Sequence, residues 1–163
     1  MTEPISSAPQ QVLCFALAGE NYGIPILKVR EIQCLATLTR IPRSPDFMPG
    51  VINLRGAIVP IIELRTRFRL GAPPEGTRPV IVIVELAGRT LGMRVDAVSD
   101  VVTLAPDQLR PPPDFGCDGG IGREFISALA PLAEADGTES MLILLDLERL
   151  LSRSELDTLE QVL

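Results

Sequence analysis

The sequence predicts a mainly β protein of the barrel class. Two apolar runs, 80–84 and 141–145, have the length of buried strands and are too short for ordinary buried helices. Glycine-containing turns separate the apolar segments, and proline makes up 15 of 163 residues, nearly twice the usual share of about 5%. Many short strands with few helices are typical of small barrels, and this length permits one ordinary domain or two small fused ones.

The first half of the chain contains five predicted strands. They occupy 12–17, 22–24, 38–41, 51–54 and 57–64. Gly and Asn in the segment Ala18-Gly19-Glu20-Asn21 tolerate the positive φ of a hairpin turn, and Arg55-Gly56 marks a second turn. Pro60 has no backbone N–H, so we expect its strand at a sheet edge or a bulge. Three prolines predict a structured loop for the rest of 36–50.

A short helix is predicted between the first hairpin and this loop. Pro25 suits the first turn of a helix, and Ile26, Val29 and Ile32 recur at helical spacing. We therefore expect an amphipathic helix over 26–35. Its apolar stripe would face the core or form the edge of a binding groove.

The second half repeats the pattern of short strands after a polar, Pro/Gly-rich connection at 66–76, which is the expected boundary between two subdomains. Strands are expected at 79–86, 90–95, 98–104, 125–132 and 141–147. The first two form a hairpin because Ala87-Gly88-Arg89 is a turn signal. A proline-rich arm follows at 106–115, and a terminal helix is expected at 153–163.

The two ends of the chain carry different signals. Residues 1–10 are rich in Pro and Ser and should be flexible, and they lack the basic and apolar regions of a signal peptide, so we expect a cytoplasmic protein. At the other end, Ser154-Glu155-Leu156-Asp157 fits a capping box, and Leu156, Leu159 and Leu163 share one face of the helix. Apolar runs fall far short of the ~20 residues that cross a bilayer, so direct membrane insertion is not expected.

Composition excludes several classes of function. A net charge of −6 and a pI near 4.7 disfavour nucleic-acid partners. Without histidine there is no phosphorylated histidine, no Ser-His or Cys-His nucleophile and no imidazole metal ligand. Cys14, Cys34 and Cys117 have no CxxC spacing, and one must stay unpaired, which favours a reducing compartment. We therefore expect no metal and no cofactor.

Three carboxylates, Glu63, Asp96 and Asp100, leave an enzymatic alternative open. A small β-barrel hydrolase could use such groups as an acid/base pair, but no nucleophile motif or phosphate-binding loop accompanies them. Asp96 and Asp100 stand where turn and cap residues end strands. A binding protein without catalysis is the favoured interpretation.

The tetrapeptide Asn53-Leu54-Arg55-Gly56 is the most informative motif. As a hairpin turn it needs Gly56 in the left-handed conformation, but the turn does not explain the arginine. A guanidinium at such a tip can bind a carboxylate through two hydrogen bonds or be offered to a partner. We predict an ion pair between Arg55 and Glu31 that fixes the shape of a binding surface.

The chain resembles the CheW family of chemotaxis coupling proteins from about residue 11 to 152. The matching stretches, in the order of the family, are 15–32, 39–65, 91–101, 108–115 and 141–147. One departure is Glu63, where the family usually has Asp before Leu-Arg, and it keeps the charge.

The resemblance implies two SH3-like five-stranded barrels, roughly 15–76 and 77–146, with strands exchanged at the ends. It implies a non-catalytic cytoplasmic adaptor that joins methyl-accepting chemoreceptors to the histidine kinase CheA in arrays, with possible CheW–CheW or CheA–CheW rings. The domain also occurs within CheA and CheV, but this chain has no phosphotransfer histidine, no nucleotide-binding motif and no room for a receiver domain.

Partner-binding residues also follow from the resemblance. The receptor-binding set is Val29, Glu31, Ile32 and Arg55, and the kinase-binding set is Leu38, Arg40, Ile41 and Val51. The apolar groove between the barrels, lined in part by Val29 and Ile32, is expected to receive one helix of the receptor tip. The prolines of the kinase-binding loop would lower the entropy lost on docking.

Overall fold

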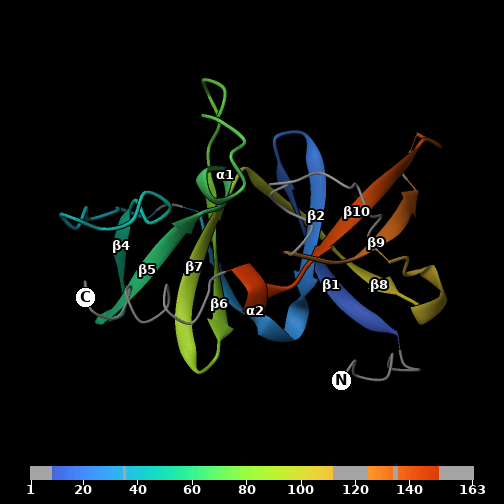
Figure 1. Cartoon of the computed structure of the whole chain (residues 1–163), viewed down its shortest axis with the longest axis horizontal. Helices are drawn as coiled ribbons and strands as arrows, with labels where there is room; N and C mark the ends of the chain where they lie inside the picture. Colours follow the sequence, from blue (N-terminus) through green and yellow to red (C-terminus); the bar gives the residue numbers. More distant parts are fainter. Residues whose placement is uncertain (1–8, 35, 112–124, 134–135, 151–163) are drawn as a thin grey trace.

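The structure, a computed structural model, describes residues 9–34, 36–111, 125–133 and 136–150. Ten strands in this part of the chain form two five-stranded sheets, sheet A with the order β8-β1-β2-β10-β9 and sheet B with the order β3-β6-β7-β5-β4 (Figure 1). The strands are β1 (Gln10–Leu17), β2 (Glu20–Pro25), β3 (Val29–Gln33), β4 (Gly50–Leu54), β5 (Ala57–Glu63), β6 (Val80–Leu86), β7 (Arg89–Val95), β8 (Ala97–Leu104), β9 (Ile126–Ala133) and β10 (Glu139–Leu145). The short helices are η1 (Ile26–Lys28), α1 (Leu64–Arg67), η2 (Pro106–Gln108) and α2 (Leu147–Leu150). The predicted mainly β class with SH3-like sheets is confirmed, although the described strands leave both sheets open where closed barrels were expected.

Each sheet takes strands from both halves of the chain. In sheet A, β1 and β2 pair with strands of the second half, and in sheet B, β6 and β7 pair with strands of the first half. β2 runs parallel to β10, and β7 runs parallel to β5. The expected division into 15–76 and 77–146 placed the exchange of strands at the ends. In the structure, the strands exchanged are the first hairpin of each half, β1–β2 and β6–β7.

The two halves repeat one order of elements: a hairpin, a single strand, a second hairpin and a short helix. The first hairpins turn at Ala18-Gly19 and Ala87-Gly88, where all four residues have positive φ between 50° and 82°. Positive φ at both turn residues matches the twist of the flanking strands. Gly23 and Gly92 take corresponding places, since a Cβ at either would lie 2.4 Å from a side-chain carbon of a neighbouring strand. The fold is therefore two copies of one unit that have exchanged their first hairpins.

Several strands are buried on both faces, which explains the continuous apolar runs of the sequence. On β6, Ile81 and Ile83 belong to a cluster within sheet B, whereas Val82 and Val84 belong to the large cluster that both sheets share. A third cluster lies within sheet A around Val12 and other residues of β1, β9 and β10. Because successive side chains of a strand alternate in direction, one strand supplies two of these clusters. The shared cluster fills the space between the sheets.

The helix predicted over 26–35 is wrong. The segment forms one 3-10 turn, η1, and then the strand β3. A β-bulge lies between Val29 and Glu31, because Val29 pairs with Val84 but Glu31 pairs with Ile83. The extra residue brings Val29 and Ile32 to the same face of a strand although they are three apart. This spacing imitates the periodicity of a helix.

Pro60 lies in an interior strand, whereas an edge or a bulge was expected. Val51 lies opposite Pro60 in the β4–β5 pair. Its backbone N–H and C=O instead form hydrogen bonds with Thr39, at 2.9 and 2.8 Å. Val51 and Pro60 are therefore a pair without hydrogen bonds between them, and the N–H that proline lacks is not required. The ladder to β7 begins only at Ile61. The missing N–H therefore leaves no strand partner unsatisfied. The strand expected at 38–41 is reduced to this one bridge between Thr39 and Val51.

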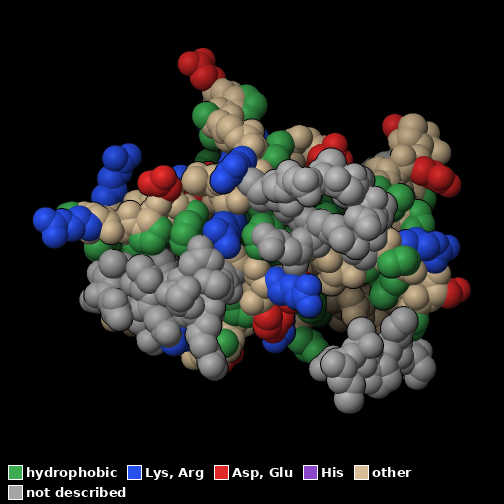
Figure 2. Space-filling view, viewed as in Figure 1, with side chains coloured by type: hydrophobic (Ala, Val, Ile, Leu, Met, Phe, Trp, Pro, Cys, Tyr) green, Lys and Arg blue, Asp and Glu red, His purple; other side chains and the backbone are tan. Residues whose placement is uncertain are grey.

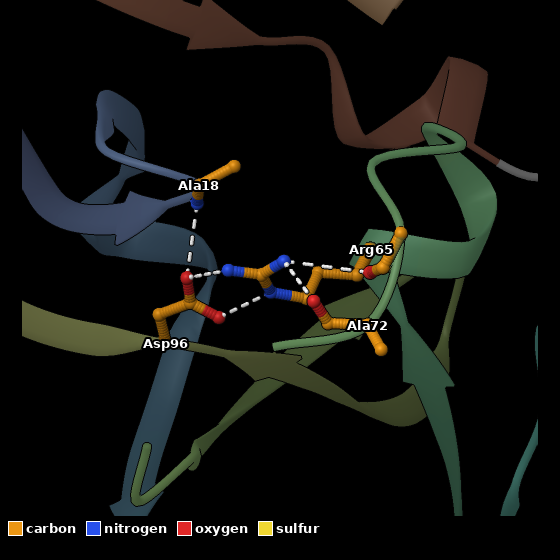
Figure 3. Close-up of polar contacts among 5 residues, drawn as sticks. Ala18, Arg65, Ala72 and Asp96 are labelled. Carbon is orange, nitrogen blue, oxygen red and sulfur yellow. Dashed lines mark hydrogen bonds and ion pairs between the residues drawn. The ribbon is translucent and has the colours of Figure 1, made fainter. Parts of the chain in front are cut away.

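Asp96 occupies the point where the chain passes from sheet B to sheet A, between β7 and β8. Its carboxylate accepts hydrogen bonds from Arg65 Nε at 2.7 Å and Nη2 at 2.6 Å, and from the backbone N–H of Ala18 at 2.9 Å (Figure 3). Arg65 is buried at 6% exposure, and its Nη1 also donates to the Ala72 carbonyl at 3.2 Å. One carboxylate thus joins the first hairpin of sheet A to α1 of sheet B.

Three predictions concern residues outside the described part of the chain. The first is the flexibility of 1–10, of which only residues 9 and 10 are described. The second concerns the thiol of Cys117, and the third is the helix at 153–163. The two described cysteines are free, Cys14 buried and Cys34 exposed.

Asp96→Asn should lower the free energy of unfolding at pH 7 by about 3 kcal/mol, because it leaves a buried guanidinium without its counter-charge. The hydrogen bonds from Arg65 lower the pKa of Asp96. The ion pair therefore contributes its full stability above the unfolded pKa of about 3.9 and loses it as pH falls through the lower folded pKa. Urea titrations from pH 7 to pH 2.5 should show the difference between wild type and variant shrinking below about pH 4. Asp100→Asn, which removes an exposed carboxylate, is the control, and an equal loss in both variants would contradict the assignment.

Candidate functional site

The candidate site lies along β3, at the edge of sheet B. The bulge directs two consecutive side chains, Arg30 and Glu31, to one face, where both line the same groove. Arg30 forms an ion pair with Glu85 of the neighbouring strand. β3 therefore presents a pair of opposite charges to the groove and turns Val29 and Ile32 to its other face.

The turn between β4 and β5 is built to hold an arginine at its tip. Arg55 and Gly56 both have positive φ, at 49° and 91°, so Arg55 shares the left-handed conformation expected for Gly56 alone. The Asn53 side-chain oxygen accepts a hydrogen bond from the Gly56 N–H at 2.8 Å, which fixes the turn from within. Left-handed backbone is rare for a residue with a side chain. The direction in which Arg55 projects is thus fixed by the backbone.

The predicted ion pair between Arg55 and Glu31 is present. Arg55 Nη1 donates to Glu31 Oε1 at 3.2 Å, and Nη2 donates to Oε2. Gln33 Nε2 donates to the same carboxylate. The hydrogen bonds from Arg55, and then from Gln33, lower the pKa of Glu31. Arg55 is largely exposed and Glu31 mostly covered, so the pair spans the rim of the groove.

The groove beside this pair has a volume of about 630 Å³. Its lining combines charged groups from three places, β3, the β4–β5 turn and the β6–β7 turn, where Arg89 follows Gly88. Its apolar residues include Ile58, which is 57% exposed, and the buried Leu91. Sequence reasoning missed Arg89, which belongs to a predicted turn, and Ile58, which lies two residues after one. Elsewhere, on the face shown in Figure 2, basic and acidic side chains are interspersed with hydrophobic ones.

The expected receptor-binding residues divide between two faces. Glu31 and Arg55 line the groove described above, but Val29 packs on the cluster between the sheets, and Ile32 is 40% exposed on that same side. The apolar groove expected between the barrels is filled in the described structure by this cluster. Ile32 is therefore the accessible apolar residue of the expected set.

The expected kinase-binding residues differ in exposure. Val51 is buried, Leu38 packs on the cluster within sheet B, and Ile41 packs on the cluster between the sheets. Arg40 is exposed. Leu38 also lines a second groove, of about 670 Å³, at the far end of β3. Of these four residues, Arg40 is the most exposed, Leu38 and Ile41 are half-buried, and Val51 is buried.

Exposed apolar residues occupy corresponding positions in the two repeated units. Ile32 on β3 and Val101 on β8 are 40% and 48% exposed, and they lie opposite Val82 and Leu13 in equivalent registers. Ile58 on β5 and Met141 on β10, 57% and 46% exposed, are likewise equivalent. Each sheet thus carries a similar apolar pair on its surface.

The carboxylates of the enzymatic alternative do not form a facing pair. Both oxygens of Asp96 are bonded to Arg65, and Glu63 accepts a 2.7 Å hydrogen bond from Arg94. Asp100 is exposed on β8. Asp96 is thus a structural residue at a strand end, as the turn interpretation predicted. Within the described residues there is no cluster of three potential metal ligands, and no helix there is long and apolar enough to span a membrane.

Arg55→Ala should raise the pKa of Glu31 toward its ordinary value, because the variant removes the hydrogen bonds that lower it most. The carboxyl carbon shift of Glu31, followed by NMR during a pH titration, measures this. Arg30→Ala is the control, since Arg30 pairs with Glu85 and its loss should leave the pKa of Glu31 lowered. Little change in the free energy of unfolding is expected because the pair is at the surface. A Glu31 titration that is the same in wild type and Arg55→Ala would refute the pairing.

Comparison with known proteins gives consistent matches over most of the chain. The family model described as the CheW-like domain matches residues 11–155. The chain is 42% identical to the chemotaxis protein CheW of Klebsiella aerogenes over 153 residues, which covers 94% of this chain and 88% of the relative. It is 35% identical to CheW of Treponema pallidum, with 91% and 86% covered. The crystal structure of the scaffolding protein TtCheW from Thermoanaerobacter tengcongensis is similar, with a TM-score of 0.75 and 35% identity over 88% of this chain and 92% of that one.

Proposed function

This chain belongs to the CheW family, and from that premise we propose that it is a chemotaxis adaptor that couples methyl-accepting chemoreceptors to the histidine kinase CheA. One observation carries the proposal: Ile32 of the expected receptor-binding set and Arg40 of the expected kinase-binding set are exposed at different places on two sheets that a shared core joins. A single rigid chain can then hold two partners at once. The adaptor would act in the cytoplasm at receptor arrays, without catalysis, and could join rings with CheA or with other copies.

The receptor surface is placed around β3 and the β4–β5 turn. Ile32 supplies an accessible apolar anchor, and the Arg55–Glu31 pair holds the two elements in fixed relation. Val29 supports this surface from the core side. Apolar anchors of this kind dominate binding energy, while exposed ion pairs contribute mainly to specificity and the rate of encounter.

The kinase surface is placed on the loop around Arg40. Leu38, Ile41 and Val51 are packed against the core and would set the shape of this loop, and Arg40 would contact the kinase. The bridge between Thr39 and Val51 anchors the loop to β4. Pre-ordering of this kind lowers the entropy lost on docking.

Ile32→Asp should weaken receptor binding at least tenfold, because it places a charge on an apolar anchor. The measurement is co-sedimentation with receptor-containing membranes at varied protein concentration. Val101→Asp, the same change at the corresponding position of sheet A, is the matched control and should retain receptor binding. If Ile32→Asp keeps a native CD spectrum and binds receptor with unchanged affinity, the receptor surface does not include Ile32.

Arg40→Glu should weaken binding to CheA on the order of tenfold by slowing association, and it should leave receptor binding intact. Pull-down and surface plasmon resonance with purified CheA measure this. Arg43→Glu reverses an exposed charge in the same loop and serves as the control. Equal losses for both variants would indicate a general charge effect and contradict a specific role for Arg40.

A further inference from the structure

The two repeated halves of the chain, β1 to α1 and β6 to α2, can be matched residue by residue. Leu144 takes the place in sheet A that Ile61 takes in sheet B, since each lies beside the buried glycine of the exchanged hairpin. Phe47 and Phe125 also match, because their carbonyls accept 2.8 Å hydrogen bonds from the backbone N–H groups two residues after Ile61 and Leu144. Counting along the chain from the same strand pairs gives three further matches, which are Leu27 with Asp96, Arg65 with Glu148 and Arg67 with Leu150.

An ion pair joins the two halves at each of two matched places. In sheet B, the buried Arg65 of α1 binds Asp96, which follows β7. In sheet A, the Glu148 carboxylate of α2 lies 3.0 Å from Lys28 Nζ, and Lys28 follows the match of Asp96 by one residue. The first half therefore supplies the cation at both places, and the second half supplies the carboxylate at both.

Arg67 lies where the two halves meet, between residues that match each other. Its guanidinium carbon is 5.1 Å from the ring centroid of Phe47 and 5.3 Å from that of Phe125. Its Nε donates a 2.8 Å hydrogen bond to the carbonyl of Leu150, which is its own match in the second half. One arginine thus occupies a place that two identical halves would have to share.

These contacts suit the pairing of a first half with a second half and no other combination. In a symmetric pair of first halves, the buried Arg65 would face Lys28 in place of a carboxylate, and two Arg67 guanidiniums would meet. In a symmetric pair of second halves, Asp96 would face Glu148. Leaving a buried charge without its partner is strongly unfavourable, so both symmetric pairs are disfavoured.

We propose that the two halves form a recognition pair, in which a first half binds a second half and rejects another first half. The connection between them contains no helix or strand over 70–79, and 71–76 are all exposed. The contacts between the halves therefore specify the pairing, and the second half can come from the same chain or from a second copy that folds beside it. This inference does not depend on the proposed adaptor function.

The first test uses the full chain, which is folded and then cut by a site-specific protease within 73–76. The two pieces should stay together as a one-to-one complex in native mass spectrometry. After unfolding in urea and refolding, complexes of a first half with a second half should exceed self-paired complexes at least tenfold. Separation of the pieces after cutting, or comparable amounts of all three complexes after refolding, would overturn the proposal.

Glu148→Arg tests the role of the charges, because it gives the second half the cation that Arg65 supplies to the first. Two second halves could then pair each Asp96 with an arginine, and their self-pairing in the cut chain should rise at least tenfold. Glu139→Arg makes the same change in charge at an exposed site on β10 and is the matched control. Both variants should keep a native CD spectrum before cutting. Equal self-pairing in the two variants would contradict recognition by charge.

A final experiment asks whether a second copy can supply the second half. Labelled and unlabelled intact chains are refolded together at high concentration and cut only afterwards. Complexes of one labelled and one unlabelled half should form, and they should be at least tenfold rarer when the two batches are refolded separately and mixed just before cutting. Absence of such mixed complexes from the co-refolded sample would overturn exchange between copies and confine the recognition to a single chain.

Discussion

The hydrogen-bonded contact between Asp96 and Arg65 is the constraint on which the arrangement of the two sheets depends. Asp96 stands at the crossing between the sheets, and its carboxylate also holds the turn of the β1–β2 hairpin through Ala18. The guanidinium comes from α1, immediately after β5. Three segments far apart in the sequence therefore meet at one charge pair, and the shared apolar cluster packs around the geometry that it sets. The ion pair fixes how the two sheets are oriented, while burial of the apolar cluster contributes most of the free energy of folding.

The candidate site inherits its shape from backbone features more than from its charged groups. The bulge in β3 turns Arg30 and Glu31 to one face, and the left-handed backbone of Arg55 points that side chain back across the gap. Because the backbone already directs Arg55 and Glu31 toward each other, the two side chains form their ion pair without further rearrangement. In the proposed adaptor role, this rigidity lowers the entropy that is lost when a partner binds.

Sequence reasoning predicted the strands and hairpin turns well, because turn chemistry and apolar alternation are local signals. It also predicted the pairing of Arg55 with Glu31. It failed at 26–35, where a bulge placed Val29 and Ile32 on one face at helical spacing. It could not assign the hairpins to their sheets, since strand pairing at long sequence separation leaves no local mark. The burial of Val51 follows from its bridge to Thr39, which is likewise non-local.

The exchange of hairpins has a consequence for how the protein is made. β2, at Glu20–Pro25, finds its parallel neighbour in β10, at Glu139–Leu145, near the other end of the chain. On a ribosome that adds 5–20 residues per second, the first hairpin must wait on the order of ten seconds before sheet A can close. Such high contact order predicts slow folding, with an exposed hairpin edge throughout synthesis. Until β10 has emerged, the edge of β2 therefore stays open to contacts with other chains.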